Sequence, residues 1–275
     1  MGAAAAAAAF LALFLLERAR PLRRWAEPGL GRVARNLALG GLSAAVVLLL
    51  QWVTLRPFAA WAEGRGLGLV PALGLPRPLG LALSVLLLDY TLWHWHRWNH
   101  QVPLLWRFHL VHHVDRDLDA STGLRFHFGE MALSVVYRAL QVALVGSGTA
   151  GLDLWTGLLL VSILFHHSNL RLPLGLERVL VRVVVTPRMH GIHHSERRTE
   201  VDMNFSSLLS VWDLLHGTLR LDVPQGGITI GVPAYRDAGQ IGLGAQLTLP
   251  FRRQGPAWPG QERPRGARRA LRLQA

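Results

Sequence analysis

Histidines at helical spacing are the residues of this chain whose types and positions could do chemistry. His96 and His100 form an HxxxH pair, and two HxxHH triplets begin at His109 and His190. Residues three and four apart share one face of an α-helix, so each triplet is expected to aim its imidazoles at a single point. Neutral imidazole is the commonest side-chain ligand for transition metals, whereas unpartnered buried histidines are costly to desolvate. The set offers more nitrogens than one tetrahedral zinc ion uses, which indicates two metal ions.

Three interpretations of these histidines compete at the level of residue types. A low-complexity histidine tract would bind metal loosely, but these residues keep fixed spacings among Trp, Leu and Phe. A zinc protease would carry a glutamate inside an HExxH motif, and neither triplet has one. The third is a redox centre of two metals beside a membrane, because imidazole suits iron and open coordination positions let oxygen bind. Ligand type leaves the metal open, since the same nitrogens bind zinc more tightly in the general affinity order.

The composition is typical of a membrane protein. Hydrophobic residues make up 51% of the 275 residues and gather in long runs. Cysteine is absent, so a metal site must use nitrogen and oxygen ligands. The formal net charge is +12, and every basic residue except histidine is arginine. Because the arginines flank apolar runs, they fit the positive-inside rule better than a nucleic-acid-binding groove.

Five apolar runs are expected to enter the membrane: residues 3–16, 36–55, 79–95, 131–145 and 152–165. Arginines follow the first run and do not precede it, which favours a membrane helix with a cytoplasmic C-terminal end over a secretory signal. With the N-terminus outside, both histidine blocks are expected on the cytoplasmic face, where they can build one centre. The stretch after Pro250 is rich in Arg, Pro and Gly and is expected to be disordered.

The stretches around the histidines resemble the fatty acid hydroxylase/sterol desaturase superfamily over roughly residues 80–220. The similar stretches are DYTLWHWHRWNHQVPLLWRFHLVHHVDRDLDASTGLRFHFGE (89–130), FHHSNLRLP (165–173) and TPRMHGIHHSERRTEVDMNFSSLLSVWDLLHGT (186–218). The family consists of integral membrane di-iron oxygenases. The resemblance implies an all-α integral membrane helical bundle whose histidine-rich helical cap, on the cytosolic face, holds a dimetal centre. It also implies a catalytic domain in 79–220, which the apolar runs and composition frame with N-terminal membrane helices and loops in 1–78 and a partly disordered tail in 221–275.

Carried over residue by residue, the resemblance implies nine metal ligands: His96, His100, His109, His112, His113, His167, His190, His193 and His194. It implies no catalytic residue beyond the metal centre and no residue that binds another cofactor. His166 is expected to lie off the ligand face, because adjacent helical side chains such as those of His166 and His167 diverge by about 100°. His94 is two residues from His96 and is expected to fall off its face as well. His216 is expected to be structural.

Metal-binding imidazoles need a hydrogen-bond partner on their other nitrogen. Residues near the motifs supply the candidates for that orienting role, of which Asn204 and Asp213 also match family positions: His127, Asp89, Asn204, Asp213, Asp115, Glu130 and Asp202. A solvated or capping role is favoured for Asp115. Ser206 stands where the family commonly has glycine, and little effect is expected because serine is small.

The resemblance implies an O2-dependent oxidoreductase that hydroxylates or desaturates an unactivated C–H bond of a lipid or sterol-like substrate. Its expected cofactors are two iron ions and O2, with zinc as the ion that could replace iron in purified or overexpressed protein. No haem, flavin or nicotinamide motif occurs, so a separate reductase or carrier is expected to supply electrons. The expected partners are a lipid from the bilayer, this electron donor and the membrane, and no nucleic acid. Two alternatives stay open, a membrane zinc-dependent hydrolase and a non-enzymatic metal-binding membrane protein.

Overall fold

The computed structural model of the chain describes residues 3–27 and 29–262. Within these residues the secondary structure is helical, and β-structure is limited to isolated bridges. The first half contains α1 (Ala3–Ala19), α2 (Leu30–Leu50), the π-helix η1 (Gln51–Leu55), α3 (Arg56–Gly64), α4 (Leu69–Ala72), α5 (Arg77–Gln101), α6 (Pro103–His113) and the 3₁₀-helix η2 (Thr122–Leu124). The second half contains α7 (Phe128–Val145), α8 (Gly148–His167), α9 (Leu174–Leu180), α10 (Pro187–His193), α11 (Arg198–Val201), α12 (Val211–His216), η3 (Gln225–Gly227), η4 (Ala238–Gln240), α13 (Leu243–Thr248) and η5 (Leu249–Phe251).

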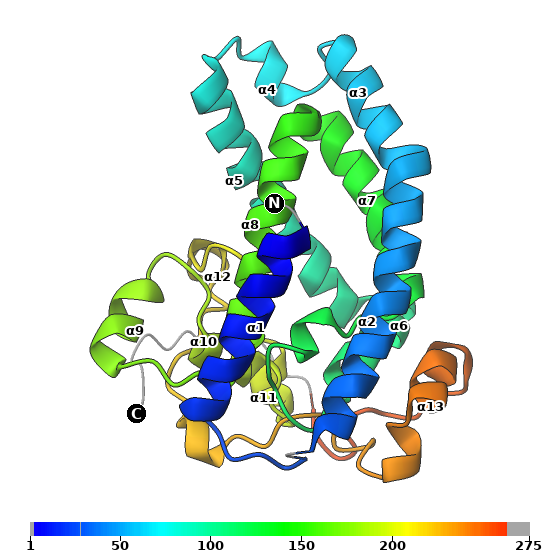
Figure 1. Cartoon of the computed structure of the whole chain (residues 1–275), viewed down its shortest axis with the longest axis vertical. Coiled ribbons are helices and arrows are strands. Elements are labelled where there is room, and N and C mark those ends of the chain that lie inside the picture. Colours follow the sequence, from blue (N-terminus) through cyan, green and yellow to red (C-terminus); the bar gives the residue numbers. More distant parts are fainter. Residues whose placement is uncertain (1–2, 28, 263–275) are drawn as a thin grey trace.

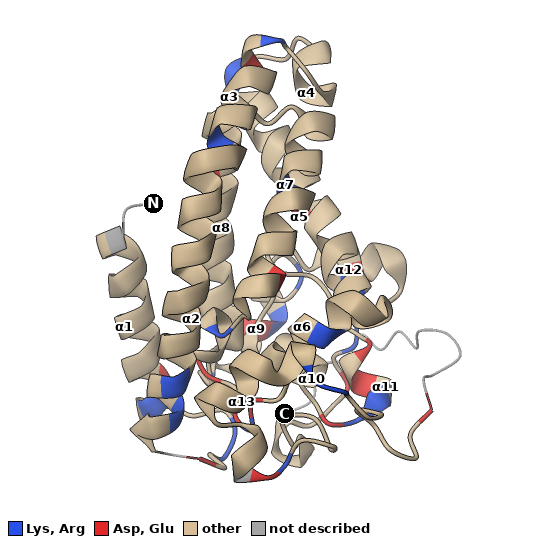
Figure 2. Ribbon diagram, turned by 90° about the vertical axis from the view of Figure 1, so that its right-hand side faces the viewer, with Lys and Arg blue, Asp and Glu red and all other residues tan. Residues whose placement is uncertain are grey.

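Three helical segments within the described residues are long and apolar enough to cross a membrane: Leu30–Ala72, Phe128–Val145 and Gly148–His167. They run side by side in Figure 1, with α7 and α8 joined as a hairpin. Gly146 ends α7 in the left-handed conformation at φ 70°, the geometry that glycine adopts most easily at a helix C-terminus. Charged residues lie mainly at the end of the molecule away from the α7–α8 turn (Figure 2). The five membrane segments expected from the sequence stay a prediction, although α1 and α5 also form as helices.

Short helices and loops form a cap at the charged end of the long helices (Figure 1). We define the cap as α6, the loop that follows it, and the segment from α9 to α13 with its loops. α5 joins the two parts, because this single helix of 25 residues begins in the apolar bundle and ends with the first histidine pair. α5 packs against α6, α7 and α8, so bundle and cap share a continuous framework around the histidines.

A buried ion cluster ties α2 to the loop that follows α6. The guanidinium of Arg32 donates from Nη1 to Asp115 Oδ2 at 2.8 Å and from Nη2 to Asp119. Its Nε lies 3.9 Å from Asp117 Oδ2, and the Arg32 side chain is 1% exposed. Asn36 adds a hydrogen bond to Asp115. Asp115 is therefore a structural residue of this cluster, and the cluster fixes the chain directly after the first histidine triplet.

Gly40 lies where α2 meets the backbone of η2. A Cβ atom at Gly40 would lie 2.7 Å from the carbonyl oxygen of Leu124, whereas a Cβ at Gly41 would meet nothing within 4 Å. Gly40→Ala is therefore expected to reduce the free energy of unfolding by about 1–3 kcal/mol. Gly41→Ala is the matched control and is expected to be neutral or slightly stabilising, because alanine favours helix. Thermal unfolding of both variants in one detergent checks this, and equal melting temperatures would contradict it.

The segment after α13 packs against α6. Trp258 is 7% exposed and its ring lies 5.3 Å from that of Trp106, between ring centroids. Arg107 donates hydrogen bonds to the carbonyl oxygens of Pro250 and Arg252. The structure thus differs from the expected disorder over residues 251–262, because Trp258 supplies an apolar anchor that the Arg, Pro and Gly content conceals. The rest of the expected disordered tail, 263–275, lies outside the described residues.

Candidate metal centre

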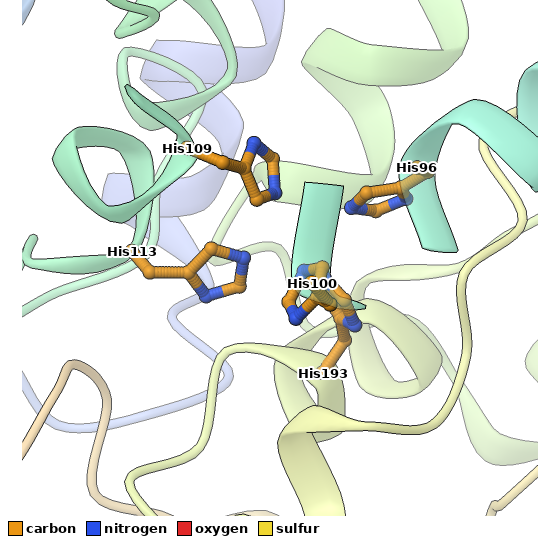
Figure 3. A group of neighbouring side chains, drawn as sticks. All are labelled: His96, His100, His109, His113 and His193. Atoms are coloured by element: carbon orange, nitrogen blue, oxygen red, sulfur yellow. The ribbon is translucent and has the colours of Figure 1, made fainter. Parts of the chain in front are cut away.

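Five buried histidines form the first of two groups whose side-chain nitrogens converge (Figure 3). α5 contributes two of them, α6 two and α10 one, and one nitrogen of each lies within 4.8 Å of the others: His96, His100, His109, His113 and His193. The stick view shows the five rings surrounding a common space. We call this set the five-histidine group.

Four further buried histidines form the second group, contributed by α6, α8 and α10 and by the residue that follows α10: His112, His167, His190 and His194. Their Nε2 atoms meet directly. The Nε2 of His167 lies 3.1 Å from that of His112 and 3.0 Å from that of His190. The Nε2 of His194 lies 3.1 Å from that of His190. We call this set the four-histidine group.

The two HxxHH triplets do not each point at one site, so that prediction from the sequence is wrong. Residues i and i+4 of the first triplet, His109 and His113, join the five-histidine group, while His112 joins the other. The second triplet divides the opposite way, with His193 alone in the five-histidine group. The reason is angular, since i and i+4 differ by about 40° around a helix while adjacent residues differ by about 100°. Each triplet therefore bridges the two groups.

Backbone carbonyl groups hold several imidazoles by their Nδ1 atoms. The Nδ1 of His96 lies 2.7 Å from Phe205 O, and that of His193 lies 2.8 Å from Met203 O. The Nδ1 of His167 lies 2.8 Å from Ile163 O within α8. Because Nδ1 donates to an oxygen in this arrangement, Nε2 keeps its lone pair and points into the group. These acceptors could not be identified from the sequence, because every residue has a backbone carbonyl group and residue type does not indicate which one accepts a hydrogen bond.

Burial favours the neutral, cation-binding form of two histidines of α10, His190 and His193. Burial lowers the pKa of His193 to about 3 and holds the pKa of His190 well below its usual range, with neighbouring imidazoles adding to the effect at His190. The Nε2 atoms of His109, His113 and His193 are buried and lack a hydrogen-bond partner. Converging, neutral and unpaired nitrogens are costly to bury alone and are suited to a transition-metal ion. The residues thus fit one metal ion in each group.

Glu130 orients one imidazole of the five-histidine group through its carboxylate. The Nδ1 of His109 lies 2.9 Å from Glu130 Oε1, and both side chains are buried. Glu130 stands in the first turn of α7 and also lines the pocket described below. Among the carboxylates near the motifs, it is the one that contacts a histidine of the groups most closely, while Asp202 lies 3.9 Å from the Nδ1 of His100.

Replacing Glu130 with leucine is expected to weaken metal binding about 10–100-fold, because the ring of His109 loses the acceptor that fixes its orientation. Glu130→Gln is the matched control. It keeps a carbonyl oxygen for the Nδ1 of His109 and is expected to lose much less affinity. Metal titration of the apo-protein with each variant measures the difference, and equal affinities for the two variants would contradict the orienting role.

Asn204 and Asp213 shape the loop that carries two of the carbonyl acceptors. Asn204 has a left-handed φ of 58°, and its side chain exchanges hydrogen bonds with the backbone of Met189 and Arg220. Asp213 accepts hydrogen bonds from the backbone N–H groups of Phe205 and Ser206. Neither side chain hydrogen-bonds an imidazole of the groups. Their effect on the centre therefore passes through the loop 203–206.

Asp89 and His127, the other two candidates for an orienting role, are also structural. Asp89 accepts hydrogen bonds from the N–H of Leu209 and from Trp212 Nε1. His127 caps α7 by accepting from the N–H of Gly129. Its Nε2 lies 3.2 Å from the carbonyl oxygen of Leu247. Both residues tie the bundle to the cap without contacting either histidine group.

The remaining histidines lie outside both groups. His216 stacks on the indole of Trp93 at 3.9 Å between ring centroids. The ring of His94 packs edge-on against that of His216, with centroids 5.3 Å apart. His166 faces His190 with ring centroids 4.2 Å apart and lines the pocket. The positions of His94 and His166 agree with the divergence of their side chains from the neighbouring ligand faces.

A pocket opens between α5, α7 and α8 beside both histidine groups. Its empty volume is about 720 Å³, part of it open to the surroundings. Histidines of both groups form one part of the lining, and apolar side chains form much of the rest: Leu92, Trp95, Phe126, Leu159 and Ile163. The arrangement can hold an apolar molecule against two adjacent metal sites.

Comparisons with known proteins agree with this geometry. A family model described as fatty acid hydroxylase matches residues 81–218. The chain is 32% identical to the ornithine lipid hydroxylase OlsE of Rhizobium tropici over 66% of this chain and 53% of that protein. It is 26% identical to the alkylglycerol monooxygenase of Homo sapiens, over 49% and 29%, and to the cholesterol 25-hydroxylase of Mus musculus, over 50% and 46%. The chain thus spans about half or less of the length of these relatives. No solved structure gives a significant match.

Proposed function

Since the chain belongs to the fatty acid hydroxylase family, we propose that it is a membrane-bound di-iron oxygenase that hydroxylates an unactivated C–H bond of a lipid. The observation that carries the proposal is the pair of buried histidine groups that share one largely apolar pocket. The names of the relatives, which include lipid and sterol hydroxylases, support the reaction class. The test below distinguishes hydroxylation from desaturation, in which two hydrogens are removed from neighbouring carbons.

The five-histidine and four-histidine groups would each hold one iron ion. Iron bound there would supply activation of O2 and the oxidising power needed to break a C–H bond. Histidine nitrogens also bind zinc, so zinc could occupy the groups in purified or overexpressed protein. The lowered pKa values of His190 and His193 favour binding of either metal near neutral pH, because a metal ligand must be deprotonated.

The chain's own residues position the substrate and keep water away. Leu159 and Ile163 on α8 and Leu92 on α5 line the route to the histidines, and these side chains favour a hydrocarbon chain over water. His96, His112 and further histidines of the groups form the end of the same pocket. A lipid bound there would present one carbon to the metals, while the apolar lining excludes bulk solvent during the reaction.

The pocket lies among helices long and apolar enough to cross a membrane. We therefore propose that the substrate enters from the bilayer. The arginines that follow α1 lie at the same end as the cap, which supports a cytosolic position of the metal centre under the positive-inside rule. An electron donor, either a reductase or a small carrier, would then meet the cap from the cytosol.

Incubation of the iron-loaded protein in lipid nanodiscs with reductant, labelled O2 and a panel of lipids tests the proposal. We expect a product that has gained one labelled oxygen atom, detected by mass spectrometry. Loss of two hydrogens without oxygen would indicate desaturation. An unlabelled hydrolysis product that forms without oxygen and needs zinc would replace the proposal with a membrane zinc hydrolase. Lack of any turnover with two metals bound would favour a metal-binding protein.

A further inference from the structure

Arg138 is a basic side chain in the middle of a helix that can span a membrane. It is the only Lys or Arg in the sequences of α7 and α8. A charged side chain at such depth is costly, and it is generally found facing the protein interior or a cavity, paired with a group of opposite charge. The position of Arg138 therefore raises the question of what that group is.

Arg138 lines the same pocket as the histidines. Glu130, Ser134, Arg138 and Gln141 recur at helical spacing, so they share one face of α7, and all four line the pocket. Glu130 marks the metal end, because its carboxylate contacts His109. From residue 130 to residue 138 the helix rises about 12 Å, at about 1.5 Å per residue. The pocket thus joins the metal sites to a fixed cation further along the bundle.

The neighbouring polar side chains on this face already have partners in the protein. Tyr137 donates from its hydroxyl to the carbonyl oxygen of Thr91 at 2.8 Å. Gln141 donates from Nε2 to Thr91 Oγ1 at 2.6 Å and to Leu88 O at 3.1 Å. These bonds fasten α7 to α5. Tyr137 and Gln141 are thus satisfied by α5, whereas the positive charge of Arg138 has no negative side chain beside it among the described residues of this region.

Arg138 makes one contact of electrostatic kind, in which its guanidinium carbon lies 5.2 Å from the ring centroid of Trp155 on α8. An aromatic face attracts a cation but does not neutralise it. No carboxylate within residues 3–27 and 29–262 forms an ion pair with Arg138. The cation therefore faces a pocket for an apolar molecule without an anion of the protein to balance it.

We propose that Arg138 binds an anionic group of the lipid substrate, a carboxylate or a phosphate, and so fixes which carbon reaches the metals. A guanidinium suits both anions because its planar N–H groups bind two oxygens at once. The hydrocarbon part would extend from Arg138 along Leu159 and Ile163 to the histidines. The oxidation step rests on the proposed function, whereas the binding step can be measured without it.

Equilibrium binding to the full chain in nanodiscs tests the anion site directly. The probes are brominated palmitate, its methyl ester and a brominated lysophosphatidate, each detected by quenching of tryptophan fluorescence and corrected with empty nanodiscs. We expect the wild type to bind an anionic probe at least about tenfold more tightly than the ester, as a charge-assisted hydrogen bond provides. A preference for palmitate would identify the carboxylate as the group bound, and a preference for lysophosphatidate the phosphate.

Three variants separate recognition from pocket shape. Arg138→Gln is expected to abolish the preference for the anionic probe and to leave ester binding within about twofold, while Arg138→Lys keeps most of the preference, because a charged donor remains. Arg65→Gln is the matched control, since Arg65 also lies over a tryptophan ring but is exposed. Equal binding of palmitate, lysophosphatidate and ester by the wild type would overturn the proposal. So would an equal loss of all three probes in Arg138→Gln.

The position of oxidation gives an independent readout. We compare anionic lipids of two chain lengths. If Arg138 anchors the anionic group, the oxidised carbon lies the same number of carbons from that group in both lipids. In Arg138→Gln the oxidised position is expected to vary along the chain. A constant count from the methyl end would overturn the anchor. If the wild type oxidises no lipid, the proposed function fails, and the binding preference alone then decides the role of Arg138.

Discussion

Replacing His193 with alanine is expected to abolish lipid oxidation and to remove the metal ion of the five-histidine group. The Nε2 of His193 is buried without a hydrogen-bond partner, and its Nδ1 is held by Met203 O. His112→Ala is expected to do the same to the four-histidine group. Removal of a ligand should reduce metal affinity by more than the roughly 10–100-fold that is typical when the hydrogen-bond partner of a ligand is removed.

Metal analysis of protein purified without oxygen measures this result, with iron per chain compared between the wild type and the two variants. We expect about two iron ions per chain in the wild type and fewer in each variant. The spectrum of the remaining iron should differ between the variants, because His193→Ala affects the five-histidine group and His112→Ala the four-histidine group. His94→Ala and His216→Ala are the controls. Both residues lie outside the groups and pack on Trp93. Equal loss of metal in all four variants would contradict the assignment of ligands.

Replacing Arg32 with leucine is expected to destabilise the whole cap. The side chain lies among the carboxylates of Asp115, Asp117 and Asp119. Its removal leaves these buried negative charges balanced only in part, by Arg125 at 3.6 Å from Asp115. Breaking a buried ion cluster in this way costs about 3–5 kcal/mol. For a chain of this size we expect the melting temperature to fall by about 10 °C. Metal should be lost as well, because the cluster fixes the chain directly after His113.

Arg35→Leu is the matched control on the same helix. Arg35 pairs with Glu27 at 2.8 Å, with side chains 30% and 22% exposed. Solvent screens such a pair, so its loss is expected to change stability by less than about 1 kcal/mol. Thermal unfolding in one detergent, followed by circular dichroism, compares the two variants. A similar small shift for both would show that the Arg32 cluster contributes little to the fold.

Residue type and spacing singled out eight of the metal-ligand candidates, and the family resemblance added His167. All nine fall into the two groups, and the helical fold was also expected. The division of each triplet between the groups was missed. Spacing places His112 near the face of His109, but only the packing of α6 against α5 and of α10 against α8 decides which nitrogen meets which neighbour.

The partners behind the ligands were harder to predict for a physical reason. Phe205 and Met203 act through carbonyl groups, whose direction depends on the left-handed turn at Asn204 and on the grip of Asp213. Proximity in sequence singled out Asn204 and Asp213 but not their action on the loop. Glu130 was among the carboxylates considered, and its contact with His109 depends on how α7 packs against α6.

Each histidine group draws on both halves of the chain, and this sets the order of events during biosynthesis. The five-histidine group lacks a member until His193 is made, and the four-histidine group until His194 is made. Proteins emerge from the ribosome N-terminal part first. The apolar helices α2, α7 and α8 are therefore synthesised before either pocket for a metal is complete. Metal insertion is consequently a late event, and a nascent chain halted before α10 would carry most of the histidines but no finished centre.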